Sequence, residues 1–325
     1  MMKNDCLNVW KGIGAFFVVF IHCSFPSPVG GMMNGLARFA VPLFFMVSGY
    51  FAYGRPETVV RRRMGKSFRV FLGANLVYFF WSLFLLYQDG ELTGRAVAEF
   101  FSPASFWQFI LWNQSPFMYH LWFLGALLYC YLFYSLLLRF QMEERVYILI
   151  PLCLAANLIL GEGLGILGSK VPVFYMRNFW VTGLPFFLWG HWFAGKQKKL
   201  SARPGFLVCA AAAGACLSMG EMLASGGAEL YLGTIVAVGS LFLFALQKPA
   251  LGRGSLLAHI GEKDSQHIYL WQVIVYYIIS FLAEKTGMSG HALYNWLVPL
   301  AVCMASWLLA ELLVKIGDFR KENTV

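Results

Sequence analysis

Charged residues are scarce in this sequence of 325 residues, at 13% of the chain, whereas soluble domains carry about 25%. Hydrophobic residues make up 59% instead, and 18% of the residues are aromatic. A soluble chain of this length could not hide so much apolar surface, so the composition excludes a water-soluble globular protein. It predicts an integral membrane protein whose aromatic residues anchor many helices at the membrane surfaces.

Cysteine and histidine also lack paired or clustered spacing. The seven cysteines are scattered mostly through apolar segments without a Cys-x-x-Cys pair, and the six histidines lie in different segments. This scatter predicts cysteines that pack as small apolar residues, and it provides no ligand set for a metal ion. The sequence has neither a glycine-rich phosphate loop nor an internal repeat. The missing repeat weakens a transporter of the inverted-repeat type without excluding it.

Long apolar runs dominate what is present. About ten runs are long enough to cross a hydrocarbon layer of about 30 Å as helices. They cover approximately residues 8–25, 37–54, 68–88, 118–138, 145–161, 178–195, 205–222, 229–246, 266–283 and 292–314. The fifth run is the weakest, because Pro151 and Asn157 interrupt it. The sequence therefore predicts an all-α, polytopic integral membrane bundle that forms one domain over residues 1–325, with no appended soluble domain.

The placement of lysine and arginine predicts the orientation of these helices. With the N-terminus in the cytoplasm, 19 of the 25 cations fall in cytoplasmic segments and 5 fall on the opposite side. Cytoplasmic loops are enriched in these residues, so the asymmetry favours an N-in, C-in chain with an even number of spans. It also accounts for the net charge of +9 without a nucleic-acid partner, since anionic lipid attracts basic loops.

The remaining cation, Lys11, lies inside the first apolar run and shares it with His22. In a helix the two side chains would lie on one face, roughly 16 Å apart along the axis, which is about half the hydrocarbon thickness. A cation and an imidazole are costly in lipid, so this stripe predicts a face that lines a protein interior or a water-filled path. Two ordinary roles stay open, because Lys11 could extend to the headgroups and His22 could be a hydrogen-bonded structural group.

Six short motifs follow one another along the chain. They are Lys11-x10-His22, Arg38-Phe-Ala-Val-Pro-Leu-Phe-Phe-Met-Val-Ser-Gly-Tyr50, Lys66-Ser-Phe-Arg69, His120-Leu-Trp-Phe-Leu124, Leu184-Pro-Phe-Phe-Leu-Trp-Gly190 and Ser265-Gln-His-Ile-Tyr-Leu-Trp-Gln272. As an ordered set they resemble the signatures of the membrane acyltransferase-3 family over most of the chain. Three positions depart from the family pattern: lysine replaces arginine at 11 and 66, and Gln272 stands where many members have histidine.

The resemblance implies transfer of an acyl group, usually acetyl, from cytoplasmic acyl-CoA to a hydroxyl of an envelope glycan, glycolipid or similar acceptor. It implies a bundle of about ten helices in the inner or plasma membrane, with acetyl-CoA as co-substrate and no permanently bound cofactor. Expected partners are the lipid bilayer, acyl-CoA and the glycan acceptor. Some members carry a fused esterase-like domain, which this sequence lacks. We therefore expect the chain to act alone, as a homo-oligomer or with an envelope-assembly partner.

His22 and Lys11 are the candidate catalytic residues. A sugar hydroxyl is barely nucleophilic at neutral pH, and an imidazole with a pKa of about 6.5 is suited to remove its proton. Alternatively, His22 would carry the acyl group briefly as a nucleophile. Lys11, nearer the cytoplasm, would hold the pantetheine-phosphate region or a carbonyl oxygen.

The densest group of cations lies before the third apolar run, on the side where CoA would arrive, and consists of Arg61, Arg62, Arg63, Lys66 and Arg69. Guanidinium groups bind phosphate well, although most of this group is also explained by the orientation of the chain. The motif singles out Lys66 and Arg69, with Arg63 beside them, as candidates for binding CoA. Lys66 would act as a point charge, because an ammonium cannot form the bidentate contact of a guanidinium.

Five further motif residues are candidates for binding the acceptor: Arg38, Ser48, His120, Trp122 and Tyr269. Arg38, at the outer end of the second run, would bind an anionic acceptor or orient His22. Simpler roles stay open for several of them. Arg38 could anchor the helix at the membrane surface, Trp122 could pack in the core, and the hydroxyls could join helices through hydrogen bonds.

Two other functions stay open. A transporter or flippase-like carrier could move a small polar molecule along the same intramembrane path, and a structural role in an envelope-assembly complex is the third alternative. Transport predicts accumulation of a substrate without acyl-CoA, whereas the enzyme predicts release of CoA.

Overall fold

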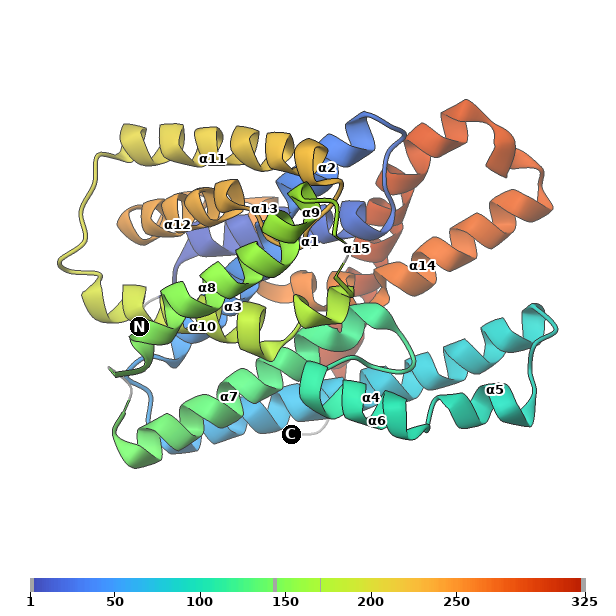
Figure 1. Ribbon diagram of the computed structural model, residues 1–325, viewed down its shortest axis with the longest axis horizontal. Coiled ribbons are helices and arrows are strands. Elements are labelled where there is room, and N and C mark those ends of the chain that lie inside the picture. The colour runs from blue at the N-terminus through green and yellow to red at the C-terminus, as the bar shows by residue number, and fades with distance from the viewer. Residues whose placement is uncertain (1–2, 143–144, 170, 323–325) are drawn as a thin grey trace. The chain divides into compact units, whose positions relative to one another are not determined.

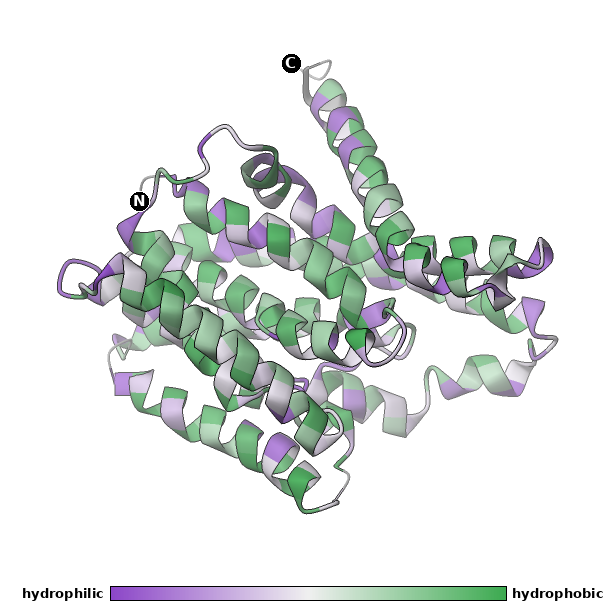
Figure 2. Ribbon diagram, turned by 90° about the horizontal axis from the view of Figure 1, so that it is seen from above, coloured by the Kyte–Doolittle hydropathy of each residue, from purple (hydrophilic) through white to green (hydrophobic). Residues whose placement is uncertain are grey.

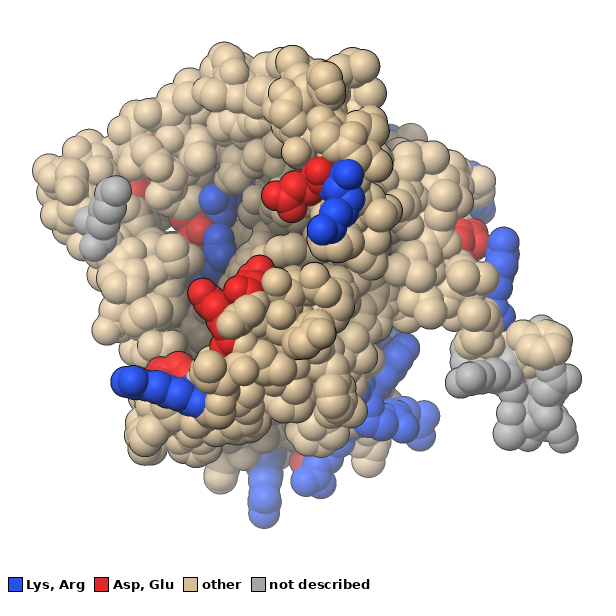
Figure 3. Space-filling view, turned by 90° about the vertical axis from the view of Figure 1, so that its right-hand side faces the viewer, with Lys and Arg blue, Asp and Glu red and all other residues tan. Residues whose placement is uncertain are grey.

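The computed structural model describes residues 3–142, 145–169 and 171–322, which form helices joined by turns (Figure 1). No strand occurs within these ranges, so the predicted all-α class is confirmed. Hydrophobic residues dominate along the helices, and hydrophilic residues gather toward helix ends and connecting segments (Figure 2). On the face shown in Figure 3, charged side chains occupy small separate patches.

Eight helical segments of the described chain are long and apolar enough to cross a membrane. They are Asp5–His22, Val29–Ala52, Glu57–Gln88, Tyr119–Phe140, Arg145–Ile166, Pro204–Ser225, Leu256–Lys285 and Ala292–Phe319. A shorter apolar helix covers Leu232–Gln247. The polytopic membrane bundle is therefore confirmed, while the number of ten spans and the N-in orientation stay predictions.

The chain divides into two compact units, of which the first combines Met1–Phe44 with Gln197–Val325 and the second is Phe45–Lys196. The single domain proposed for residues 1–325 stays a prediction.

All seven cysteines are free, and Cys6, Cys23, Cys130 and Cys303 are buried, as expected for apolar packing residues.

The first unit is built around helix α1 (Asp5–His22). Its N-terminus is fixed by Asn4, whose side chain accepts a hydrogen bond from the Leu7 N–H at 2.9 Å and donates one to the Ala245 carbonyl at 2.9 Å. The other helices of this unit are α2 (Val29–Ala37), α11 (Pro204–Ser225), α12 (Leu232–Gln247), α13 (Leu256–His259), α14 (Ser265–Lys285) and α15 (Ala292–Glu322), together with the start of α3 (Ala40–Ala52).

Small residues allow these helices to approach closely. A side chain at Gly12 would collide with the Leu257 carbonyl, and one at Gly261 would collide with the Asn8 carbonyl. This contact holds the π-turn η6 (Ile260–Asp264) directly against α1. Helices α11 and α12 lie side by side in the same way, with Gly214 against Gly233 (Figure 1). Close packing through small residues is typical of membrane helices, which have no hydrophobic effect to hold them together.

The second unit contains α4 (Glu57–Gln88) and α7 (Trp122–Phe140), which pack along each other, and α10 (Leu184–Lys196), which packs on residues 45–52 of α3 through Gly49 and Gly190. Residues between α4 and α7 form two short helices, α5 (Gly94–Glu99) and α6 (Pro103–Trp112). One side of α4 exposes Leu72, Leu76 and Phe80 at helical spacing, as expected for a surface that contacts lipid.

The weak fifth run forms a membrane-length helical segment in spite of its two interruptions. Pro151 lies in the first turn of α8 (Leu149–Leu158), where a missing backbone N–H costs little. Asn157 is fully buried, and its amide donates hydrogen bonds to the Met176 and Val181 carbonyls and the Thr182 hydroxyl. Neither residue therefore breaks the segment.

Candidate active site

Lys11 and His22 lie on the single unbroken helix α1, as the spacing predicts. Ala15 and Val18 lie between them on the same stripe, four and seven positions after Lys11, and are exposed by only 0% and 1%. Lys11 and His22 themselves are partly buried. A stripe whose central residues are covered completely does not face lipid. This burial supports an inward-facing polar stripe, while the path along it stays a prediction.

An acidic partner for Lys11 comes from η6. Glu262 is the carboxylate that acts on the Lys11 ammonium, because the contact of Gly12 with Leu257 and of Gly261 with Asn8 brings η6 alongside this turn of α1. The same carboxylate accepts a hydrogen bond from Lys3, at 2.5 Å, and this bond raises the pKa of Lys3. The Lys11 end of the stripe therefore lies within the electrostatic influence of a carboxylate.

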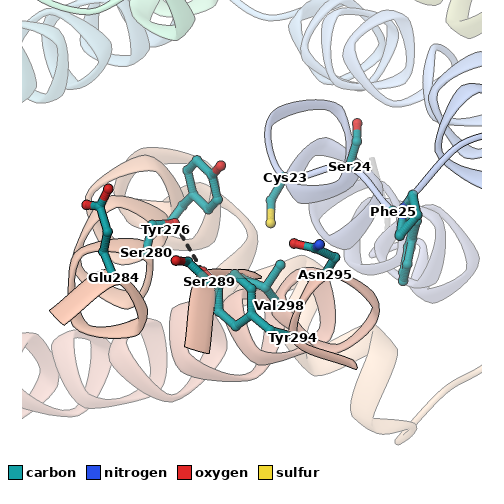
Figure 4. Close-up of a pocket in the computed structure, with 11 residues that line it drawn as sticks. Cys23, Ser24, Phe25, Tyr276, Ser280, Glu284, Ser289, Tyr294, Asn295 and Val298 are labelled. Atoms are coloured by element: carbon teal, nitrogen blue, oxygen red, sulfur yellow. Dashed lines mark hydrogen bonds between the residues drawn. The ribbon is translucent and has the colours of Figure 1, made fainter. Parts of the chain in front are cut away.

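A polar pocket of about 450 Å³ opens where α1 ends, directly after His22 (Figure 4). Its lining residues come from the end of α1, from α14 and from the start of α15, and they are Cys23, Ser24, Phe25, Pro26, Tyr276, Ser280, Glu284, Ser289, Tyr294, Asn295 and Val298. The Cys23 thiol and the Asn295 amide point toward each other in this view. The Tyr294 hydroxyl donates to the Ser280 hydroxyl at 3.4 Å. Hydroxyls and an amide thus face a space that begins at Cys23, the residue after His22, while His22 itself is not among the lining residues.

Buried polar side chains without a hydrogen-bond partner occur where α14 and α15 pack in the first unit. Gln272 on α14 is 1% exposed and Ser306 on α15 is 0% exposed. Ile268 and Val275, which flank Gln272 on its helix face, pack in one cluster with Val19 and other residues of α1. An unsatisfied buried amide costs free energy and is unusual outside functional sites. The family motif position 272 therefore lies at the core that α1, α14 and α15 share. Tyr269, one turn earlier on α14, is also buried.

Arg38 ends α2 and has an acidic partner within the first unit. Its Nη1 donates to Glu229 Oε2 at 2.8 Å, and the two side chains are exposed by only 9% and 14%. The sequence analysis did not anticipate this pair, because the two residues are far apart in the chain. An anionic acceptor would have to compete with Glu229 for the guanidinium, so the role of Arg38 in binding an acceptor stays a prediction.

We expect Glu229→Ala to destabilise the protein by about 3–5 kcal/mol, since removing one partner of a buried ion pair leaves the other charge uncompensated. Thermal unfolding of the purified protein in detergent measures the effect. The double variant Arg38→Met, Glu229→Leu should recover most of the lost stability, because neither charge is then left buried. An unfolding temperature of Glu229→Ala equal to that of the wild type would show that the pair contributes nothing.

The other predicted site residues belong to the second unit. Helix α4 begins at Glu57, so Arg63, Lys66 and Arg69 lie on its first turns rather than in a loop. Lys66 and Arg69 are exposed, which leaves them accessible to a soluble anion, whereas Arg63 is half-buried. The Arg63 guanidinium and the Ser48 hydroxyl both interact with the Tyr131 hydroxyl on α7. Ser48 and Arg63 thus contact α7, and their roles in binding stay predictions, whereas Lys66 and Arg69 are the accessible motif members of the cationic group.

His120 and Trp122 lie where the turn η1 (Tyr119–Leu121) leads into α7. His120 is 1% exposed, and its ring packs edge-on against Tyr78 at 4.8 Å. Trp122 is also buried and lies 6.1 Å from the Phe45 ring. Both residues are thus part of the packed interior of the second unit, and their contact with an acceptor stays a prediction.

The structure divides the predicted site residues between the units. The first unit holds Lys11, His22, Arg38 and Tyr269, and the second holds Ser48, Arg63, Lys66, Arg69, His120 and Trp122. Glu262, Glu229 and the pocket residue Glu284 were not predicted from the sequence. No local signal marks these acids, because their significance comes only from the helices that pack beside them.

Comparison with known proteins gives one match. A family model for acyltransferase-3, described as an acyltransferase domain, matches residues 4–313 and thus nearly the whole chain. No curated protein and no solved structure matches the chain. The matched range contains all six motifs and includes parts of both units.

Proposed function

Because this chain belongs to the acyltransferase-3 family and is a membrane acyltransferase, we propose that it moves an acetyl group from cytoplasmic acetyl-CoA to a hydroxyl of an envelope glycan or glycolipid. We place it in the inner or plasma membrane. The observation that carries the proposal is the covered stripe from Lys11 to His22, after which the chain continues from Cys23 into the wall of a pocket lined partly with hydroxyls. The stripe thus places a cation and a base on one face of the helix, with the base at its C-terminal end.

In the proposed reaction, the His22 imidazole takes the proton of the acceptor hydroxyl while the oxygen attacks the thioester carbonyl carbon. A carbon–oxygen bond forms, the carbon–sulfur bond breaks, and the proton passes from the imidazolium to the CoA thiolate. Lys11 lies roughly 16 Å from His22 along the helix, so it cannot touch the reacting carbonyl at the same time. We therefore assign Lys11 to the phosphate end of the pantetheine arm.

The pocket beyond His22 supports a neutral, hydroxyl-rich acceptor. Serine and tyrosine hydroxyls and the Asn295 amide can exchange hydrogen bonds with sugar hydroxyls. Glu284 is the charged residue among the lining residues, and its carboxylate would repel a phosphate or a sugar acid. We infer that a negatively charged group of a glycolipid would lie outside this pocket.

We expect Arg69→Ala to weaken binding of acetyl-CoA by about 1.5–3 kcal/mol, the range for a hydrogen bond to a charged group. Arg69 is exposed, belongs to the motif Lys66-Ser-Phe-Arg69 and would contact a CoA phosphate. Calorimetric titration of the purified protein with acetyl-CoA measures the change, and Arg62→Ala, an exposed cation outside the motif, is the matched control. Unchanged affinity in Arg69→Ala, or an equal loss in Arg62→Ala, would contradict the assignment.

Reconstitution in vesicles separates the proposed enzyme from a carrier. With acetyl-CoA outside and an oligosaccharide acceptor present, the enzyme should release CoA thiol and acetylate the acceptor. A carrier should instead accumulate the oligosaccharide inside vesicles that contain no acetyl-CoA. Accumulation without thiol release would contradict the proposed function.

A further inference from the structure

Three potential metal ligands meet in the first unit, away from the polar stripe of α1. His259 ends α13, Asp264 ends η6 and Glu311 lies on α15. One ligand atom from each residue lies within 4.8 Å of the other two. His259 Nε2 is 3.3 Å from Glu311 Oε1 and 4.0 Å from Asp264 Oδ2. The cluster thus joins two residues of the continuous helical segment Leu256–Lys285 to one residue of α15, which is distant in the sequence.

Asp264 is the member that points to a ligand. Its side chain is 0% exposed, and neither of its carboxylate oxygens has a hydrogen-bond partner. The indole N–H of Trp307 is a neighbouring neutral donor, yet it lies outside hydrogen-bonding geometry. A buried carboxyl that keeps its charge must be paired, hydrogen-bonded or bound to a metal. The His259 imidazole at 4.0 Å does not meet this need by itself.

Neither neighbouring lysine forms an ion pair with Asp264. Lys263 forms an ion pair with Asp318 at 3.6 Å, and Lys315 forms one with Glu311 Oε2 at 3.4 Å. The second oxygen of Glu311, Oε1, is the one directed at His259. One oxygen of Glu311 therefore remains on the side of the cluster, together with the Asp264 carboxylate and the His259 ring.

We propose that His259, Asp264 and Glu311 bind a divalent transition-metal ion of the Zn²⁺ class. Two ligand atoms bound at about 2.1 Å can lie at most about 4.2 Å apart. The two distances from His259, 3.3 Å and 4.0 Å, meet this limit, and the Asp264 and Glu311 oxygens, which lie within 4.8 Å of each other, need at most a small shift to meet it. One imidazole nitrogen with two carboxylate oxygens suits Zn²⁺ or Mn²⁺, whereas Mg²⁺ and Ca²⁺ favour oxygen ligands alone.

The bound ion would brace the inner end of α1. Asp264 belongs to η6, the π-turn whose Gly261 contacts α1 and whose Glu262 acts on Lys11. Glu311 lies on the separate helix α15, so a shared ion would fasten η6 to α15. The ion would therefore hold the partner of Lys11 in place without touching a reacting group. This inference does not depend on the identity of the acceptor or the donor.

Metal binding is tested on the full-length protein in detergent after treatment with EDTA. Addition of ZnCl₂ should raise the unfolding temperature of the wild type, and elemental analysis after desalting should find about one zinc per chain. Asp264→Asn and Glu311→Gln should lose this shift. Their affinity for zinc should fall by more than the roughly 10–100-fold that is typical when a residue that only supports a metal ligand is replaced. Glu91→Gln, in an exposed turn, is the matched control.

If Asp264→Asn fails to fold, His259→Gln still tests the proposal, because His259 is exposed and its replacement leaves Asp264 intact. This variant should also lose the zinc-dependent shift. The proposal is overturned by a wild type that neither retains zinc nor gains stability from ZnCl₂. It is equally overturned by a zinc-dependent rise in unfolding temperature that survives in all three variants. An equal rise with MgCl₂ would also overturn it, because Mg²⁺ favours oxygen ligands and would not require the imidazole.

Discussion

Replacement of His22 by alanine is expected to abolish acyl transfer while the protein stays folded and inserted. Positioned general bases contribute roughly 10²–10⁴-fold to rate, and loss of a nucleophilic carrier costs at least as much. His22 ends α1 directly before the polar pocket and is only partly buried, so alanine leaves the helix and its neighbours intact. Release of CoA thiol from acetyl-CoA in the presence of acceptor measures the loss.

His291→Ala is the matched control, since His291 is an exposed histidine directly before α15. It should retain the rate and the unfolding temperature of the wild type. A rate of His22→Ala near that of the wild type would remove His22 from the mechanism. Mass spectrometry of the protein incubated with acetyl-CoA alone then separates the two roles, because only a carrier acquires an acetyl group before the acceptor arrives.

The membrane class follows from local properties of the sequence, which is why it could be predicted. Hydropathy alone locates most of the long helices, because a run of about 20 apolar residues must span the hydrocarbon layer wherever it occurs. The ends of the helices could not be predicted as well. Helix α4 begins at Glu57, well before the run expected from residue 68, because charged residues are tolerated in turns that extend beyond the membrane.

The stripe on α1 could be predicted because it depends only on the helical repeat. The positions of Lys11 and His22 determine their shared face, and the complete burial of Ala15 and Val18 agrees with it. The acids near the site could not be predicted. Glu262 acts electrostatically on Lys11, and Glu229 pairs with Arg38, because segments that are distant in the sequence pack side by side.

The cluster around Asp264 was missed for the same reason. Histidine and cysteine at regular spacing mark ligand sets on one helix or hairpin, whereas this cluster combines one histidine with two acids, and Glu311 comes from a helix distant in the sequence. The scatter of the histidines along the chain is therefore a poor guide to their neighbours in space. The π-turn that places Asp264 is likewise not encoded by a hydrophobic repeat.

Lys11→Ala is expected to lose most transfer activity, whereas Lys11→Arg should keep a substantial part of it. The proposed role of Lys11 is to hold the phosphate end of the pantetheine arm, and either cation can do so, although an arginine has a different shape. Steady-state kinetics with acetyl-CoA as the varied substrate measures the difference. Lys11→Ala should raise KM for acetyl-CoA, because the variant would lack the proposed Lys11 contact both with the bound substrate and with the transition state.

Lys3→Ala is the matched control for this experiment. Lys3 is an exposed cation that pairs with the same carboxylate, Glu262, but lies outside the stripe. Lys3→Ala should therefore leave KM for acetyl-CoA close to that of the wild type. This result would separate the effect of the Lys11 cation from the effect of a changed charge around Glu262. Equal activity in Lys11→Ala and Lys11→Arg would show that the ammonium only extends to the lipid headgroups. In that case the covered stripe would have to serve packing rather than the delivery of the thioester to His22.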